Sequence, residues 1–531
     1  MHRLRGAQFI LAFVILWQTT APASDLDTIG VTLLRAVTTN INGTGICVGQ
    51  AEAHSVANPP YDFEVDPTNN VVEQPVGLFT YYYSASPYST VSTATTFTNS
   101  LGLDSGHADA VAGNFYGMSG GVATNVAHVD NYEANGFINY YISHSHLISD
   151  RVVNQSFTEG AINTAVDQAC DTYAASNGVL FVNGAGFNAT NVWSPATSYN
   201  GIGVGVSDAP NPPPPYGPTP DGRSKPDLVT PGQYSSYTTP YVSGAAALLM
   251  QAALRGDGGS DTNSAVDSRT VKALLLNGAV KPAGWTNVVW NGTRLVLDTN
   301  YGAGVLNVFN SYKQLAGGKH GYIVATTVIP LNNPHPPTGA PGTVGVLSGW
   351  DFNTNTSSAS ADGVNHYYFN VTNAVSNATF TATATLVWNR HSSQTSINNL
   401  NLFLYNAANS NLVANSTSLV DNVEHIWLPH LAQGRYDLQV FKSGGSTVSA
   451  SEPYSLAFEF FSMSLNVAKS GTNVVLKWPV YPTGFILEST TNLISPILWS
   501  TNNPVPVVTN NQNYVVLSVT NRHQFFRLWR P

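Results

Sequence analysis

The sequence predicts an α/β domain with a mostly parallel sheet, followed by all-β modules. At 531 residues the chain is longer than one ordinary domain. Residues 46–330 alternate short apolar runs with helical patterns, as strands and helices do when helices cover a parallel sheet. After about residue 320 the runs become aromatic or alternate with period two, and Asn, Gly and Ser turns separate them, which is typical of a β-sandwich.

The first 23 residues have the pattern of a secretory signal peptide. Arg3 and Arg5 precede the apolar run Phe9–Trp17, and the small residues Ala21 and Ala23 follow it. This run is too short to span a bilayer, and the sequence has no other long apolar stretch. We therefore expect a secreted or extracellular protein without a membrane span, a bacterial periplasm or cell surface being the alternatives.

The remaining chain divides into three predicted parts. These are an α/β domain, residues 24–319, a β-sandwich, residues 320–462, and a small β module, residues 463–531. The proline-rich stretch 331–341 is the expected linker.

Periodicity places the elements of the α/β domain. A lead-in helix is expected at 26–38, and further helices at 161–176 and 268–277. The strand candidates are residues 45–51, 127–130, 152–156, 179–182 and 202–206.

Charge and composition exclude some partners. The chain has 30 acidic and 21 basic side chains, and it has no basic cluster of the kind that binds a phosphate backbone. A nucleic-acid partner is therefore excluded, and a monomer is the expected oligomeric state. The two cysteines, Cys47 and Cys170, could pair in an exported protein or remain as buried free thiols.

Ser236 lies where a polar turn leads into an apolar helix, in the segment YSSYTTPYVSGAAALLM. Backbone N–H groups in the first turn of a helix lack intrahelical partners, and the helix dipole favours an anion there. The simpler interpretation is that Ser235 and Ser236 cap a core helix. The preceding segment DGRSKPDLVTPG at 221–232, together with Pro240, favours a nucleophile, because these motifs resemble the subtilase family of serine peptidases. The resemblance implies a subtilisin-like three-layer α/β fold and places Ser236 at the family's nucleophilic serine.

The same resemblance identifies a histidine and an acid. The segment DSGHADAVAG at 104–113 resembles the family's histidine motif and places His107 at the general base. An imidazole suits that role because it titrates near neutrality. The segment GICVGQAEAH at 45–54 resembles the strand that ends in the family's aspartate, with Glu52 at that position. Glutamate has the same charge but one more methylene, while His54, two residues later, is expected to be a surface residue.

The oxyanion site and the substrate site follow from the resemblance. In the family, a side-chain amide that follows a strand like that at 178–182 donates a hydrogen bond to the oxyanion. Phe187 stands at that position here and cannot donate. We therefore assign the oxyanion donor to Asn188, one residue later, with Asn183 as the second candidate. The residues implied to flank the primary specificity pocket are Ser156, Phe157, Gly184, Ala185 and Gly186.

Metal signals are weak, and no metal ligand is assigned. His144 and His146 are two positions apart and would lie on the same face of a strand, where they could bind a metal. A strand that faces solvent explains this spacing equally well. The segment 257–263 has part of a calcium-loop pattern, and a turn that leads into a helix explains it more simply. No cofactor is required for the predicted chemistry; calcium stays open without ligands, since subtilases often bind it.

The C-terminal modules also show a resemblance. Residues 320–462, with LVWN, DNVEHIWLP and GRYDLQVFKSGG, resemble the pre-peptidase C-terminal β-sandwich of secreted bacterial peptidases, and residues 463–531 look like a small terminal β module.

The sequence thus predicts a secreted subtilisin-like serine endopeptidase that acts on proteins or peptides, with Ser236, His107 and Glu52 as its triad. The main alternative is a subtilase scaffold that has lost catalysis and serves as a binding protein. The departures at Glu52, at Phe187 and at Tyr234, which replaces the glycine of the family's serine motif, favour this alternative. A structural adhesin built from the β modules is the third hypothesis.

Overall fold

The computed structural model describes residues 24–186, 191–208, 217–287, 289–290, 293–324, 342–356, 363–375, 378–443, 448–509, 512–518 and 523–529. The expected signal peptide, the oxyanion candidate Asn188 and the expected linker 331–341 lie outside these residues.

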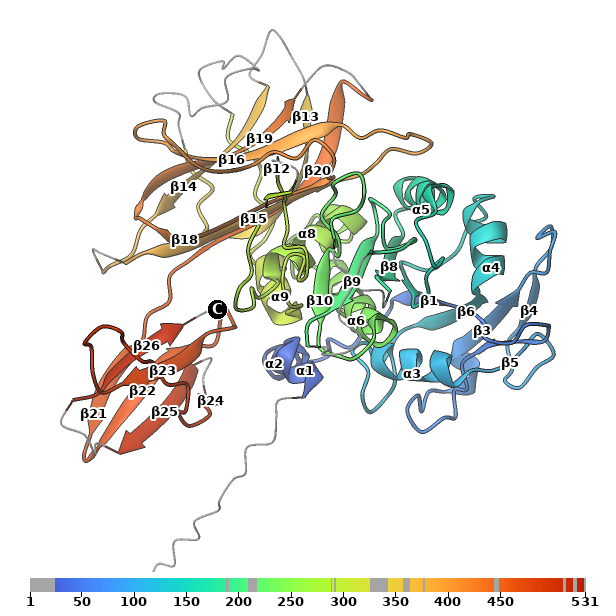
Figure 1. Ribbon diagram of the computed structural model, residues 1–531, viewed down its shortest axis with the longest axis horizontal. Coiled ribbons are helices and arrows are strands. Elements are labelled where there is room, and N and C mark those ends of the chain that lie inside the picture. Colours follow the sequence, from blue (N-terminus) through green and yellow to red (C-terminus); the bar gives the residue numbers. More distant parts are fainter. Residues whose placement is uncertain are drawn as a thin grey trace, which may run out of the picture.

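An eight-stranded sheet forms the centre of the N-terminal domain, in the order β10-β9-β8-β7-β1-β6-β3-β4 (Figure 1). Every pair in it is parallel except β3 with β4, which confirms the predicted mostly parallel sheet. The strands are β1 (Cys47–Glu52), β3 (Phe79–Tyr83), β4 (Ser92–Ala94), β6 (His128–Glu133), β7 (Val152–Gln155), β8 (Leu180–Gly184), β9 (Ile202–Val206) and β10 (Leu228–Thr230). A separate parallel pair joins β2 (Tyr61–Glu64) to β5 (Gly102–Asp104).

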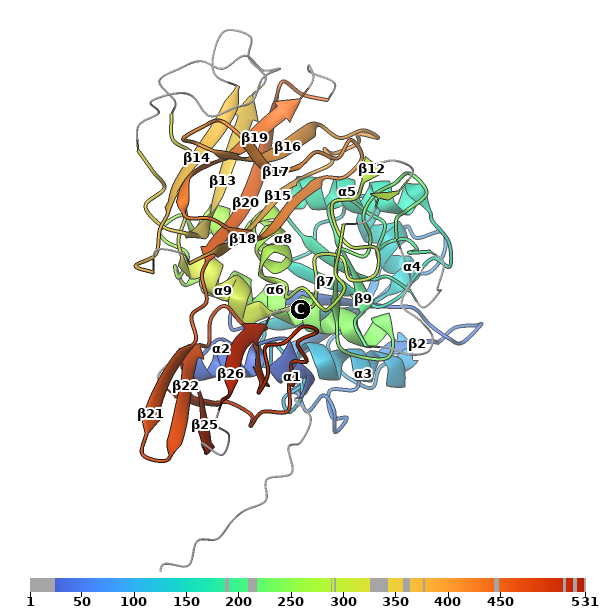
Figure 2. The ribbon, with the colours of Figure 1, turned by 60° about the vertical axis from the view of Figure 1, so that its left-hand side comes forward.

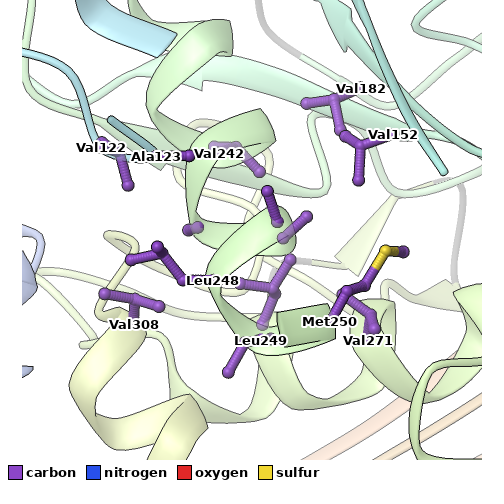
Figure 3. Close-up of a cluster of buried hydrophobic side chains, with 14 of the residues drawn as sticks. Val122, Ala123, Val152, Val182, Val242, Leu248, Leu249, Met250, Val271 and Val308 are labelled. Atoms are coloured by element: carbon purple, nitrogen blue, oxygen red, sulfur yellow. The ribbon is translucent and has the colours of Figure 1, made fainter. Parts of the chain in front are cut away.

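Helices cover both faces of this sheet. Neighbouring side chains of a strand point to opposite faces, and both faces here carry apolar side chains that need to be buried. Val152 and Val182 pack into the core that contains α6, whereas Val153 and Phe181 pack into a second core with α5. Figure 3 shows the first of these cores around α6. The helices are α1 (Asp25–Thr28), α2 (Val31–Val37), α3 (Gly106–Phe115), α4 (Ala134–Gly136), α5 (Thr164–Asn177), α6 (Ser235–Leu254), α7 (Thr262–Ala265), α8 (Ser268–Gly278) and α9 (Val308–Ala316), with short turns of helix η1 (Val76–Leu78) and η2 (Phe137–Ile142). The domain therefore has the predicted three layers.

The C-terminal region is all β, as predicted. Its sandwich has one antiparallel sheet β13-β20-β15-β18 and another β14-β19-β16-β17. These strands are β13 (Ser348–Thr356), β14 (Val364–Val371), β15 (Phe380–Trp388), β16 (Asn399–Asn406), β17 (Leu412–Ser416), β18 (Val423–Leu431), β19 (Gly434–Ser443) and β20 (Ser451–Phe461). The terminal module has the sheets β21-β22-β25-β24 and β23-β26, made of β21 (Asn466–Ser470), β22 (Asn473–Pro479), β23 (Ile486–Thr490), β24 (Val507–Thr509), β25 (Gln512–Ser518) and β26 (Phe525–Trp529). A small antiparallel hairpin of β11 (Val289–Trp290) and β12 (Thr293–Arg294) lies between α8 and α9 in the chain.

The sandwich packs on α8 and α9 of the N-terminal domain, which lie below it in Figure 2. Trp350 and Ala457 of the sandwich belong to the same buried core as Leu274 of α8. Asn277 at the end of α8 accepts hydrogen bonds from the hydroxyls of Thr383 and Thr385, at 2.8 and 3.0 Å. Apolar packing and buried hydrogen bonds therefore join the two domains.

Several smaller predictions can be compared with this fold. Cys47 and Cys170 are both free, as the second alternative had it, but only Cys170 is buried and Cys47 is partly exposed. His144 and His146 lie in a turn after η2 and not on a strand, which corrects the expected geometry. Asp261 accepts a hydrogen bond from the Ser264 N–H and caps α7, which is the helix-leading turn that was predicted. Across the described ranges, no helix has the length and apolar character needed to cross a membrane.

Candidate active site

An open cleft of about 490 Å³ lies at the carboxyl ends of β1, β7 and β8. Loops that follow parallel strands meet at this edge, so residues far apart in sequence converge there. The cleft is lined by residues from each of these loops, from β2 and from the starts of α3 and α6: Ala53, His54, Ser55, Asp62, Ser105, Gly106, His107, Ser156, Phe157, Thr158, Gly184, Gly186, Ser235 and Ser236.

Glu52 and His107 are joined by a hydrogen bond at the back of this cleft. The Glu52 carboxylate Oε2 lies 2.8 Å from Nδ1 of His107. Glu52 ends β1 and is fully buried, whereas the His107 side chain is partly exposed to the cleft. Ser105 caps α3 by accepting from the Ala108 N–H, and this cap places His107 in the first turn.

Opposing effects act on the pKa of His107. Burial lowers it, while the hydrogen bond and the charge of Glu52 raise it, and the net shift is upward from the ordinary value. The carboxylate therefore favours the imidazolium, the form that a general base adopts after it has taken a proton.

Ser236 occupies the first turn of α6 and lines the same cleft as His107. Its hydroxyl donates to the Ser156 carbonyl at 3.2 Å, and the Ser156 hydroxyl donates to the Ser236 carbonyl at 2.8 Å. Asn154 of β7 donates to the Ser156 hydroxyl and accepts from Ser243 of α6, each at 2.9 Å. These bonds hold the start of α6 against the end of β7.

The resting direction of the Ser236 hydroxyl is a feature that the sequence did not reveal. Within the described chain its hydrogen bond goes to Ser156 and none joins it to His107. The ring of Tyr237, the next residue, lies 5.7 Å from the imidazole, measured between centroids.

The comparison with protein families matches residues 93–304 to the Subtilase family. These residues have the sequence pattern of a subtilase domain. His107 and Ser236 lie inside the matched residues, and Glu52 precedes them. The family supports a serine peptidase.

The matches among solved structures include three peptidases, whereas the search of curated proteins found no match. Fervidolysin from Fervidobacterium pennivorans, described as a keratinolytic enzyme related to subtilisin, shares 14% identity, covers 94% of this chain and 79% of its own, and gives a TM-score of 0.37. The psychrophilic subtilisin-like protease Apa1 from Pseudoalteromonas sp. AS-11 shares 12% identity over 54% of this chain and 97% of its own, with a TM-score of 0.35. A protease from Pseudoalteromonas arctica PAMC 21717 shares 16% identity over 52% of this chain and 91% of its own, with a TM-score of 0.36.

The residues assigned to substrate binding in this subtilase domain take two positions. Ser156, Phe157, Gly184 and Gly186 line the cleft. Ala185 lies behind it, with its side chain buried in a small cluster with Val192 and Ala196.

The oxyanion candidates differ in what the structure describes. Asn188, like Phe187, lies outside the described residues. Asn183 is fully buried at the end of β8, and its Nδ2 donates to the Pro195 carbonyl at 3.1 Å. Its amide thus supports the loop that follows, which leaves the assignment to Asn188 as a prediction.

Sequence reasoning missed several residues around the cleft. His54 was expected at the surface but lines the cleft, where its ring stacks on Tyr61 at a centroid distance of 3.8 Å. Gln50 and Tyr116 form hydrogen bonds behind the Glu52 carboxylate. The period-two spacing of residues 50 and 52 could have placed Gln50 beside Glu52, but nothing local indicates Tyr116.

Proposed function

We propose that the protein is a secreted serine endopeptidase that hydrolyses peptide bonds through an acyl-enzyme on Ser236. The observation that carries this proposal is the hydrogen bond between Glu52 and His107 in the same cleft as Ser236. An acid, a base and a nucleophile arranged in this way are the parts that acyl transfer requires.

In the proposed reaction the Ser236 hydroxyl turns from the Ser156 carbonyl toward Nε2 of His107. His107 takes the hydroxyl proton as Oγ bonds to the substrate carbonyl carbon, and it gives that proton to the leaving amine as the C–N bond breaks. A water molecule, activated by His107 in the same way, then releases the acyl group. Glu52 stays ionised and stabilises the imidazolium.

The oxyanion of the tetrahedral intermediate needs donors that are already in place. The Ser236 N–H belongs to the first turn of α6, where backbone donors lack intrahelical partners. We assign the second donor to the Asn188 side chain. The reaction as written requires no cofactor, so we expect peptide hydrolysis to survive prolonged dialysis against EDTA.

Reaction with a fluorophosphonate tests the proposal, because such probes modify activated serines. We expect the wild-type protein to be labelled and Ser236→Ala to remain unlabelled. Ser235→Ala is the matched control, since Ser235 is the neighbouring serine and accepts a hydrogen bond from the Gly186 N–H at 3.1 Å. Labelling of Ser236→Ala would contradict the assignment of the nucleophile.

The second candidate is a binding protein on a subtilase scaffold. The hydrogen bond that the Ser236 hydroxyl donates to the Ser156 carbonyl, and not to His107, favours this candidate. An unlabelled wild-type protein that still binds peptides would support this candidate. Secretion is proposed from residues 1–23, and a mature N-terminus just after Ala23, read by N-terminal sequencing of exported protein, is the expected result.

A further inference from the structure

Glutamate at the acid position raises a positioning problem. It has one more rotatable bond than aspartate, so its carboxylate has more orientations to lose before Oε2 can stay on Nδ1 of His107. In the structure the second oxygen of Glu52 is also held. Its Oε1 accepts a hydrogen bond from Nε2 of Gln50 at 2.8 Å.

Gln50 reaches the carboxylate because residues two apart on a strand point to the same face. Both side chains of β1 point toward α3, which carries His107. Nε2 of Gln50 also donates to the Ala108 carbonyl at 2.9 Å, next to the base in the chain. The amide therefore connects the strand of the acid to the helix of the base.

Hydrogen bonding allows one orientation of this amide. Both of its N–H groups meet acceptors, and its Oε1 accepts from the Tyr116 hydroxyl at 2.6 Å. A flipped amide would place its oxygen against two acceptors and its N–H groups against the phenol. Burial raises the pKa of Tyr116 well above its ordinary value, so the phenol keeps its proton and donates it.

This arrangement is sealed from solvent. Gln50, Glu52, Ala108 and Tyr116 are all fully buried. Hydrogen bonds to a buried carboxylate are stronger than those in water, and each donor is costly to remove. Because Gln50 lies behind Glu52 and away from the cleft lining, it has no route to the substrate.

We propose that Gln50, oriented by Tyr116, is the positioning residue that makes a glutamate work as the acid of this triad. The proposal rests on the proposed function, and the role it assigns to Gln50 acts through the Glu52 carboxylate and not through the substrate. Removing the Gln50 donor leaves Oε1 free, so that the carboxylate loses its alignment with His107.

A double-mutant cycle tests this role. In the full-length protein we expect Gln50→Met to lower kcat/KM about tenfold, mainly through kcat. We expect the same substitution to change kcat/KM by less than about twofold in a Glu52→Met background, because the carboxylate that accepts from Gln50 is then gone. Equal losses in the two backgrounds would overturn the proposal.

The pKa of His107 provides a readout that needs no turnover. Histidine-labelled protein is titrated by NMR, and His107→Gln identifies the resonance among the 13 histidines of the chain. We expect Gln50→Met to lower the His107 pKa and Tyr116→Phe to lower it less. An unchanged His107 pKa in Gln50→Met would overturn the proposal. If the wild-type protein shows no turnover, the proposed function fails, while this titration still decides the role of Gln50.

Gln74→Met is the matched control. Gln74 is also buried, and its Nε2 donates to the carbonyls of Tyr116 and Thr124 near the end of α3, without contact to Glu52. We expect it to reduce the melting temperature as Gln50→Met does and to leave the His107 pKa unchanged. A shift of that pKa in Gln74→Met as large as in Gln50→Met would also overturn the proposal, because a general loosening of α3 would then explain both.

Discussion

The Glu52 carboxylate lies 2.8 Å from Nδ1 of His107 and so selects the nitrogen that can act on a substrate. A carboxylate accepts hydrogen bonds, so Nδ1 carries the proton of the neutral imidazole. Nε2 is then the basic nitrogen, on the ring of a residue that lines the cleft with Ser236. A glutamate can therefore orient the base as the family's aspartate does, provided that its longer side chain is held.

Replacing the acid tests this relationship directly. Glu52→Gln keeps the size of the side chain but can donate to Nδ1 and stabilise the wrong tautomer, so we expect kcat to fall by roughly 10⁴. Glu52→Asp keeps the charge with a shorter reach, and a smaller loss is expected. Steady-state kinetics on a peptide substrate measure both, and equal losses in the two variants would show that charge is not what Glu52 supplies.

The raised pKa of His107 determines the acid limb of activity. The base works when neutral, so kcat/KM should fall as pH drops through a pKa above the ordinary value of about 6.5. In Glu52→Gln the burial that opposes the shift is no longer compensated, so the His107 pKa should fall and the limb should move to lower pH. The raised pKa of His107 also contributes to the free energy of unfolding. This contribution is fully present below the pKa of the unfolded chain and is lost as pH rises through the raised pKa of the folded protein. Kinetics and thermal unfolding across pH measure both effects.

Gly186 forms a wall of the cleft in a backbone conformation that favours glycine. Its φ is +94°, and a Cβ there would lie 3.4 Å from the Trp193 ring and 3.6 Å from the Thr158 methyl. We expect Gly186→Ala to destabilise the fold by about 1 kcal/mol and to raise KM for peptides. Gly160→Ala is the control, because Gly160 has a φ of +70° with nothing within 4 Å of the added Cβ. It should show the same loss in urea unfolding with an unchanged KM.

Arg390 of the sandwich pairs with Asp171 of α5 at 2.6 Å, and both side chains are buried. Burial raises the pKa of Asp171, and the charge of Arg390 opposes that shift. Arg390→Met leaves the buried carboxyl without its cation, so we expect a loss of about 3 kcal/mol in urea unfolding. Arg255→Met removes the more exposed pair with Asp257 and should cost less than about 1 kcal/mol. Similar losses in both variants would contradict a special role for the interdomain pair.

Local sequence patterns were sufficient for much of the fold. The predicted strand at 202–206 is β9, and the predicted helix at 268–277 is α8 with one residue more. Such elements were predictable because fully buried parallel strands read as short apolar runs and because capping residues mark the starts of helices. His107 and Ser236 were singled out by the resemblance of their contiguous segments to subtilase motifs, and the structure places both in the first turn of a helix.

The tertiary structure alone decided how the candidate site is held. Gln50 and Tyr116 are separated by 66 positions, and their hydrogen bond exists because β1 packs against α3. His54 lines the cleft for a similar reason, since Tyr61 of β2 stacks on its ring. By itself the sequence predicted the fold class from its periodicity, and the resemblance of three motifs to the subtilase family predicted the acid, base and nucleophile. The orientation of Glu52 and the direction of the Ser236 hydroxyl depend on neighbours that meet only when strands and helices pack, and the structure was needed to find them.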